Sequence, residues 1–206
     1  MRGARLGYGA HVVLERVDLA LDAGAPVGLF GPNGGGKSTL LRALLGLLKP
    51  LAGDAHATRG AGYVPQRVAD DPLIPVTCAE WIRAGARRRR APVAELAARV
   101  GLGACLDTSL YALSGGEQRR AFLAHALAGE PAWIALDEPT AGVDAREVER
   151  LVALLADLGA KGTTLVFVTH DTELAALAER ALWVADGRVS EIAPAEARRR
   201  LAVRPR

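Results

Sequence analysis

The sequence has 206 residues, which is enough for one α/β domain with a buried core. Half of the residues are hydrophobic, which excludes a disordered chain, yet no uninterrupted apolar run approaches the roughly 18 residues of a membrane span. The formal net charge of +3 is too small to predict a nucleic-acid-binding surface.

The start of the chain predicts short antiparallel strands within residues 6–21. No apolar signal segment precedes them, and Cys78 and Cys105 are too few for a disulfide framework and lack metal-ligand spacing. We therefore expect a chain that stays in the reducing cytoplasm. The ring of Tyr8 would either fold over a nucleotide base or pack on a sheet edge, and the residues alone leave both interpretations open.

A glycine-rich loop follows, between the apolar run 27–30 and a Leu/Ala-rich helix predicted at 40–48. It fits the pattern of Gly, four free positions, and then Gly-Lys-Ser/Thr. Such a loop wraps backbone N–H groups round a polyphosphate at the positive end of a helix. We expect Lys37 to neutralise the β and γ phosphates and Ser38 to offer its hydroxyl to Mg²⁺. The predicted nucleotide-binding residues are Gly31, Pro32, Asn33, Gly34, Gly35, Gly36, Lys37, Ser38 and Thr39.

The next strand, predicted at 61–65, ends at Gln66. Because α/β sheets place ligands at the ends of their strands, Gln66 would touch Mg²⁺ or the attacking water; as a plain loop residue it would touch neither. The residues alone favour neither alternative.

Strand signals become rare in the following segment, which predicts a small helical subdomain inserted at about 67–125. Its helices are expected at 77–86 and 93–100. The four consecutive arginines at 87–90 are interpreted as a solvated surface, with contact to a partner or to lipid headgroups as the alternative.

The string Leu113-Ser114-Gly115-Gly116-Glu117-Gln118 opens an apolar helix predicted to reach residue 128. Ser114 is a good N-cap, and Glu117 lies three residues later, as in a capping box. Capping does not explain Gly115 and Gly116, each of which lowers helix propensity by about 1 kcal/mol. We interpret them as allowing an anion to approach the positive end of the helix.

An apolar strand predicted at 133–138 ends in two carboxylates. An acidic residue at such a strand end, in a protein with a phosphate loop, typically holds Mg²⁺, and this role falls to Asp137. Glu138 points the other way on an extended chain, which leaves it free to act on a water molecule near the γ-phosphate.

The C-terminal third continues the alternation of helices and strands. His170 follows a buried strand at 164–169, where it can donate a hydrogen bond to phosphate beside the carboxylates. The other predicted elements are a turn at 139–144, an amphipathic helix at 145–158, a helix at 172–179 capped by Asp171, a hairpin at 181–192 and an Arg-rich helix at 193–203.

This set of motifs, in this order, resembles the ATP-binding-cassette (ABC) ATPases. The resemblance extends from Tyr8 to about Arg188, and the six-residue string at 113–118 is the feature that other phosphate-loop ATPases lack. It implies a phosphate-loop NTPase of the ABC type, with a mostly parallel sheet, an N-terminal antiparallel β subdomain and the inserted helical subdomain. Residues 1–206 would then form a single ATPase domain.

The resemblance also implies a role for each motif, with ATP and Mg²⁺ as ligands. Tyr8 would stack on adenine, residues 31–39 would form the Walker A loop, and Gln66 would ligate Mg²⁺ and couple to a partner. The remaining roles are the nucleotide-binding signature for Ser114, Gly115, Gly116, Glu117 and Gln118, the Walker B magnesium ligand for Asp137, the general base for Glu138, the D-loop aspartate for Asp144 and the switch histidine for His170.

The partners follow from the same resemblance. It implies a head-to-tail dimer, of two copies or of this chain with a paralogous ATPase, that holds ATP between the Walker A loop of one subunit and the signature of the other. It further implies docking on permease subunits at the cytoplasmic face of a bacterial plasma membrane, with an extracytoplasmic substrate-binding protein for an importer. The string Tyr63-Val-Pro-Gln-Arg67 is similar to importers of zinc, manganese or chelated iron. The alternatives are a haem-exporter type or another exporter, and a soluble cassette acting on nucleic acid or the ribosome.

Overall fold

The computed structural model describes residues 1–56, 60–66, 75–86 and 92–203. The arginine run at 87–90 and the predicted start of the helical subdomain lie outside the described residues. Within the described part of the chain, no helix is both long and apolar enough to cross a bilayer.

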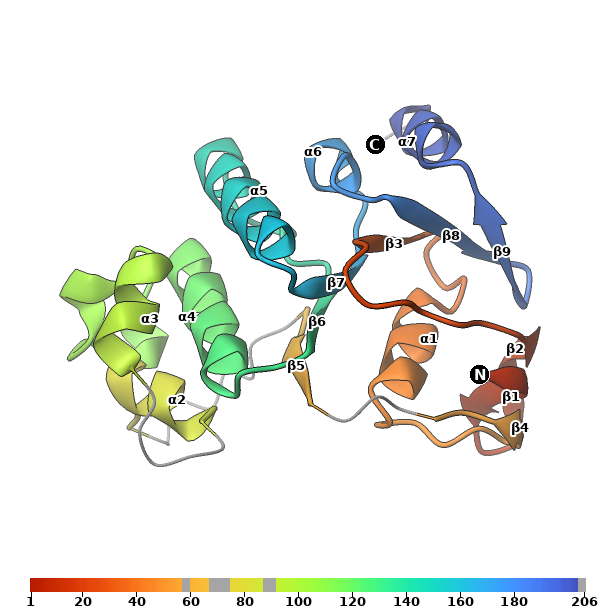
Figure 1. The fold of residues 1–206 in the computed structure, drawn as a ribbon, viewed down its shortest axis with the longest axis horizontal. Coiled ribbons are helices and arrows are strands. Elements are labelled where there is room, and N and C mark those ends of the chain that lie inside the picture. Colours follow the sequence, from red (N-terminus) through yellow and green to blue (C-terminus); the bar gives the residue numbers. More distant parts are fainter. Residues whose placement is uncertain (57–59, 67–74, 87–91, 204–206) are drawn as a thin grey trace.

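A mostly parallel six-stranded sheet forms the centre of the molecule (Figure 1). Its strand order is β5-β6-β7-β3-β8-β9, with parallel pairing throughout except for the antiparallel β8–β9 hairpin, which confirms the predicted hairpin. The bounds are β3 Val27–Phe30, β5 Ala61–Val64, β6 Trp133–Asp137, β7 Thr164–Val168, β8 Arg180–Ala185 and β9 Arg188–Ile192.

A small antiparallel sheet lies beside the central one, in the order β2-β1-β4. It consists of β1 Arg2–Tyr8, β2 His11–Val17 and β4 Ala52–Asp54. Of the range 6–21 in which short strands were expected, residues 18–21 form none, and β4 pairs with the other edge of β1 instead. The residues of β4 are all exposed and pair through their backbones, so no hydrophobic alternation announces this strand.

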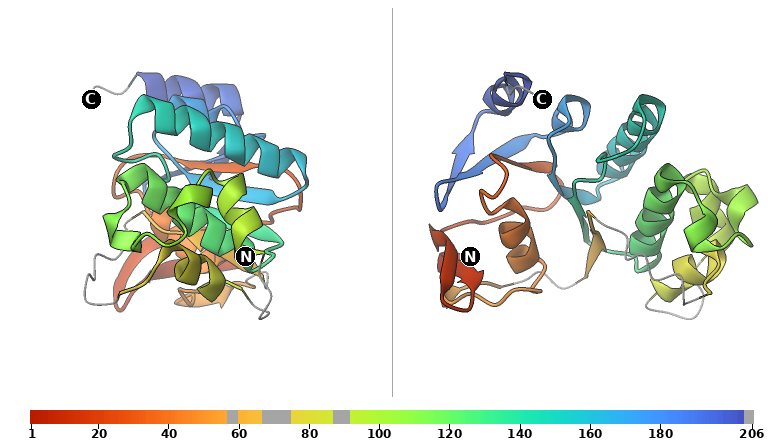
Figure 2. Two further views of the ribbon diagram at one scale, coloured as in Figure 1. Left: turned by 90° about the vertical axis from the view of Figure 1, so that its left-hand side faces the viewer. Right: turned by 180° about the vertical axis from the view of Figure 1, so that it is seen from behind.

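Helices cover both faces of the central sheet, as Figures 1 and 2 show. Helix α1 lies on the same side as the small sheet, whereas α5, α6 and α7 lie on the other, and α2, α3 and α4 form a separate group beside β5. The bounds are α1 Lys37–Leu44, α2 Cys78–Ala84, α3 Val93–Arg99, α4 Gly115–Ala128, α5 Ala145–Ala160, α6 Thr172–Ala175 and α7 Pro194–Ala202.

Helix α1 is shorter at its C-terminal end than the helix predicted at 40–48, because Gly46 reverses the chain. The φ angle of Gly46 is 73°, and the N–H groups of Leu47 and Leu48 both donate to the Arg42 carbonyl. This left-handed glycine ends the helix in the common way. Helix α6 is also shorter than predicted, since the N–H groups of Leu177 and Ala178 bond to carbonyls three residues back.

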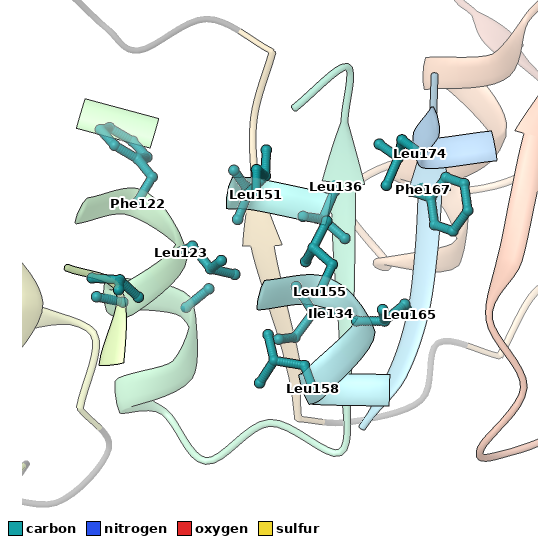
Figure 3. Close-up of a cluster of buried hydrophobic side chains, with 14 of the residues drawn as sticks. Phe122, Leu123, Ile134, Leu136, Leu151, Leu155, Leu158, Leu165, Phe167 and Leu174 are labelled. Atoms are coloured by element: carbon teal, nitrogen blue, oxygen red, sulfur yellow. The ribbon is translucent and has the colours of Figure 1, made fainter. Parts of the chain in front are cut away.

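The two faces of the central strands supply two hydrophobic clusters. On β6 and β7, Ile134 and Phe167 belong to one cluster, and their neighbours Ala135 and Val166 belong to the other. This is the period of two expected for a strand buried on both faces. Figure 3 shows the first cluster, in which leucines of α5 pack between β6 and β7 on one side and α4 on the other. The cluster fixes the strand ends that carry the predicted site residues.

Replacing Leu155 by Ala tests this packing. Leu155 lies on α5 and has no exposed surface, so the change should lower the free energy of unfolding by about 2–5 kcal/mol. The matched control is Leu154→Ala, one residue earlier and only partly buried, which should cost clearly less. Urea unfolding followed by circular dichroism measures both, and equal losses would contradict the placement of α5.

Candidate functional site

The glycine-rich loop closes round the ammonium group of Lys37. Lys37 is the first residue of α1 and is buried, and its Nζ donates to the carbonyls of Gly31 at 3.1 Å and Pro32 at 2.9 Å. Gly31 has a φ of 140°, and a Cβ there would lie 2.1 Å from the Val184 carbonyl oxygen. Gly36, with a φ of 99°, is the N-cap of α1. Both positions therefore require glycine, and the loop turns tightly into the positive end of the helix.

Ser38 and Asp137 meet beneath this loop. The Ser38 hydroxyl donates to Oδ1 of Asp137 at 3.1 Å, which joins the first turn of α1 to the end of β6. Burial raises the pKa of Asp137, and the hydrogen bond from Ser38 opposes that shift. A hydroxyl and a buried carboxylate this close are hard oxygen donors of the kind that Mg²⁺ takes, so the residues fit the ion.

Glu138 and His170 come together above the ends of β6 and β7. The Glu138 N–H donates to the Val168 carbonyl at 3.0 Å, and its Oε1 lies 3.2 Å from Nε2 of His170. Burial is the largest cause that raises the pKa of Glu138, with the charge of Lys37 opposing it and that of Asp137 adding to it. A carboxylate with a raised pKa, next to an imidazole, is a better proton acceptor than an exposed one.

Lys37, Ser38, Glu138 and His170 line one cleft of 870 Å³. Tyr8 stands at its edge, 46% exposed, and its hydroxyl accepts a hydrogen bond from Nη1 of Arg42 at 3.2 Å. Gln66, Glu138 and His170 line the cleft together with the loop residues from Asn33 to Thr39. The structure also places Thr140 and Asp171 in the lining. Sequence reasoning missed both, because Thr140 lies in a turn without a binding motif and Asp171 was interpreted only as a helix cap, a role that it does have.

The string at 114–118 lies apart from this cleft, at the start of α4. The capping box is present: the Glu117 N–H donates to the Ser114 hydroxyl at 3.3 Å, and Glu117 Oε2 accepts from the Ser114 N–H at 2.8 Å. The hydrogen bonds from Ser114 also lower the pKa of Glu117. Asp144 has a similar structural contact, because its Oδ1 caps α5 by accepting from the Glu147 N–H at 2.9 Å. Neither the string nor Asp144 lines the cleft of its own chain.

Glu147 explains one of the two glycines in the string. A Cβ on Gly116 would lie 2.9 Å from both Cγ and Oε2 of Glu147, whereas a Cβ on Gly115 would meet nothing within 4 Å. The Glu147 carboxylate is held in place by ion pairs with Arg120 and Arg150. Close approach of a neighbouring side chain therefore accounts for Gly116 without an anion. This contact was not predictable from the sequence, because Glu147 looks like an ordinary acidic residue in the first turn of a helix.

Arg119 is a further residue that sequence reasoning missed. It lies on α4 just after the string, and its guanidinium donates to the carbonyls of Glu138 at 2.7 Å and Ala141 at 2.6 Å. The start of α4 is thereby attached to the turn that carries Glu138.

Comparisons with known proteins relate this chain to a family of transporter proteins. The profile of the ABC transporter family matches residues 14–141. The zinc import ATP-binding protein ZnuC of Paramagnetospirillum magneticum is 42% identical over 178 residues, which cover 83% of this chain and 67% of that protein. The zinc transport system ATP-binding protein TroB of Treponema pallidum is 38% identical, covering 83% of this chain and 71% of that protein.

A solved structure extends the likeness to the fold. The ATP-binding cassette MJ0796, in a dimeric post-hydrolysis state bound to ADP and Pi, superposes with a TM-score of 0.78 at 27% identity. The alignment covers 94% of this chain and 97% of that one. The expected fold class is confirmed: a cassette with one antiparallel and one mostly parallel sheet.

Adding a methyl group at each glycine of the string tests the Glu147 contact. Gly116→Ala should lower the free energy of unfolding by about 1–3 kcal/mol, because the new Cβ displaces a carboxylate held by two arginines. Gly115→Ala is the matched control and should be neutral or slightly stabilising. In a Glu147→Ala background the cost of the Gly116 change should vanish; a cost that persists there would point to another cause.

Proposed function

The chain belongs to the ABC transporter family and is one of its ATP-hydrolysing subunits, and from this premise we propose that it binds Mg-ATP between two head-to-tail copies and drives zinc import through a separate permease. Residues 1–206 would act as one ATPase domain, with the helical subdomain at about 67–125. The observation that carries the proposal is the contact between Glu138 and His170 in the same cleft as the Lys37 loop.

In this proposal the triphosphate lies along the loop at the start of α1. Lys37 would leave the two carbonyls that now hold it and turn to the β and γ phosphates. Ser38, Asp137 and Gln66 would hold Mg²⁺, which when bound offsets negative charge on the phosphate oxygens. Tyr8, half-exposed at the edge of the cleft, would stack on the base.

Hydrolysis then needs one positioned base. The carboxylate of Glu138 takes a proton from a water molecule while the oxygen of that water bonds to the γ-phosphorus. The bond from that phosphorus to the β–γ bridging oxygen breaks, and ADP and phosphate leave. His170, 3.2 Å from Glu138, would keep the carboxylate turned toward the water and donate to the γ-phosphate.

The second half of each site would come from a second copy. The positive end of α4, with the backbone N–H groups of Ser114 to Gln118, lies outside the cleft of its own chain. Head-to-tail pairing would place it over the γ-phosphate held by the partner, with Asp144 on the turn nearby. The dimeric state of the similar cassette MJ0796 supports this arrangement.

Zinc is proposed as the cargo because similar proteins are named for it. The names of ZnuC and TroB describe ATP-binding proteins of zinc import and zinc transport. The ATP-hydrolysing chain would dock on its permease at the inner face of the membrane, through the surface near Gln66 and the helical subdomain. An extracytoplasmic binding protein would deliver the ion.

Glu138→Gln tests the catalytic step and the shared site together. The amide cannot accept a proton, so turnover should fall at least about 100-fold while ATP binding persists. Mg-ATP should then trap a stable dimer, measured by light scattering on a size-exclusion column. Glu149→Gln, at an exposed position on α5, is the matched control and should behave like the unmodified chain. A normal rate would remove Glu138 from the mechanism, and a monomer at saturating Mg-ATP, even with the permease present, would refute the shared site.

The coupling of ATP hydrolysis to zinc transport is measured with the permease in lipid vesicles. We expect ATP hydrolysis to rise severalfold when the permease and a zinc-loaded binding protein are present, and radioactive zinc to cross the membrane only with ATP. Manganese and a ferric chelate serve as comparison cargoes. Equal hydrolysis with and without the permease would contradict the transport role, and uptake of another cargo in preference to zinc would correct the substrate.

A further inference from the structure

Arg119 brackets the turn that follows β6. Its two terminal nitrogens donate to two carbonyls three residues apart, Glu138 and Ala141. The same Glu138 carbonyl also accepts from the Ala141 N–H at 3.1 Å, which closes the turn. A planar guanidinium suits this task because its donors form a rigid fork. One side chain of α4 thus fixes both ends of a turn that begins at residue 138.

The turn needs such support because its first residue has an unfavourable backbone conformation. Glu138 has a φ of 49°, in the left-handed region that residues with a Cβ seldom adopt. In the described part of the chain, the Glu138 backbone makes three hydrogen bonds: one from its own N–H to Val168, and two received by its carbonyl, from Ala141 and Arg119. Its carboxylate accepts a further bond from the His170 backbone. Of the three backbone bonds, only the one from Arg119 comes from a helix.

The contact is poorly suited to a purely stabilising role. Arg119 is partly buried, and burial lowers its pKa, with the charge of Glu138 opposing the shift. The groups it bonds are neutral carbonyls, which repay less of the cost of desolvating a cation than a carboxylate would. Neighbouring Arg120 makes the more usual pairing, with the carboxylate of Glu147.

We propose that Arg119 is a positioning residue that couples the start of α4 to the orientation of Glu138. The inference rests on the proposed function, in which the start of α4 closes on the nucleotide of the second copy. A shift of α4 in that closure is transmitted through the Arg119 fork to the Glu138 turn. The state of one site thereby sets the geometry of the base in the other.

A coupling of this kind has a kinetic signature. When ATP at one site promotes hydrolysis at the other, the rate depends sigmoidally on ATP concentration. Without the fork, each site should still bind ATP, because Arg119 donates to the carbonyls of the turn at 138–141, whereas the proposed phosphate-binding loop and Ser38 lie on other elements. The base would be misplaced, and the two sites would act independently.

The test compares Arg119→Gln and Arg119→Lys with Arg199→Gln. Arg199 is an exposed arginine on α7, so its change removes the same charge away from the site. For Arg119→Gln we expect kcat to fall about 10–100-fold, the Kd for Mg-ATP to stay within about twofold, and the Hill coefficient to fall toward 1. Arg119→Lys should recover only part of kcat. Lysine keeps the charge, but its single ammonium group cannot span both carbonyls.

The outcomes separate this inference from the proposal on which it rests. If Arg119→Gln matches Arg199→Gln in kcat and Hill coefficient, Arg119 has no positioning role. A fall in kcat that follows a fall in Tm and in the folded fraction, with the Hill coefficient kept, would show a structural role only and would also refute it. If the unmodified chain neither hydrolyses ATP nor dimerises as Glu138→Gln, the proposed function fails, and the coupling fails with it.

Discussion

The hydrogen bond between Ser38 and Asp137 joins two parts of the chain that are 99 residues apart in sequence. It exists because β3 and β6 are parallel strands of one sheet, separated only by β7, so their carboxyl ends reach the same edge. The glycine loop leaves β3 at that edge, and the two carboxylates leave β6 there. Everything in the cleft depends on this meeting, since neither the loop nor the carboxylates could act on a nucleotide alone.

The electrostatics of the cleft favour a cation. Burial raises the pKa values of both Asp137 and Glu138, so in the folded chain each binds its proton more tightly than when unfolded. Above those pKa values the carboxylates are ionised in a poorly hydrated place, and this ionisation reduces the stability of the fold. The charge of Lys37 offsets part of this cost, and its ammonium group also donates to the carbonyls of Gly31 and Pro32. A bound divalent cation would offset more, which is consistent with a site organised for a ligand rather than for maximal stability.

The sequence predicted the features that short patterns specify and missed those that depend on distant contacts. The loop at 31–39 and the capping box at Ser114 are local, so spacing and composition were sufficient. The strand predicted at 133–138 forms as β6 but ends at Asp137, because Glu138 is not extended and has a φ of 49°. The early end of α1 was also local, but the left-handed role of Gly46 was overlooked. Strand β4 was not predictable, because it is held by backbone pairing with β1 alone. The contacts of Arg119 and Glu147 join α4 to the turn after β6 and to α5, and such pairings become visible only once the helices are placed.

Two adjacent arginines attach the start of α4 to two different elements. Arg119 fixes α4 to the turn at 138–141, and the Arg120–Glu147 pair fixes it to the first turn of α5. Asp144 caps that turn, so the segment from Glu138 to Glu147 is held at both ends by adjacent arginines of one helix. The same segment is attached to the sheet, because the Glu138 N–H donates to Val168 and the preceding Asp137 accepts from Ser38. In the proposed dimer, a nucleotide bound by the loop of one copy and the helix start of another would therefore act on the catalytic turns of both copies.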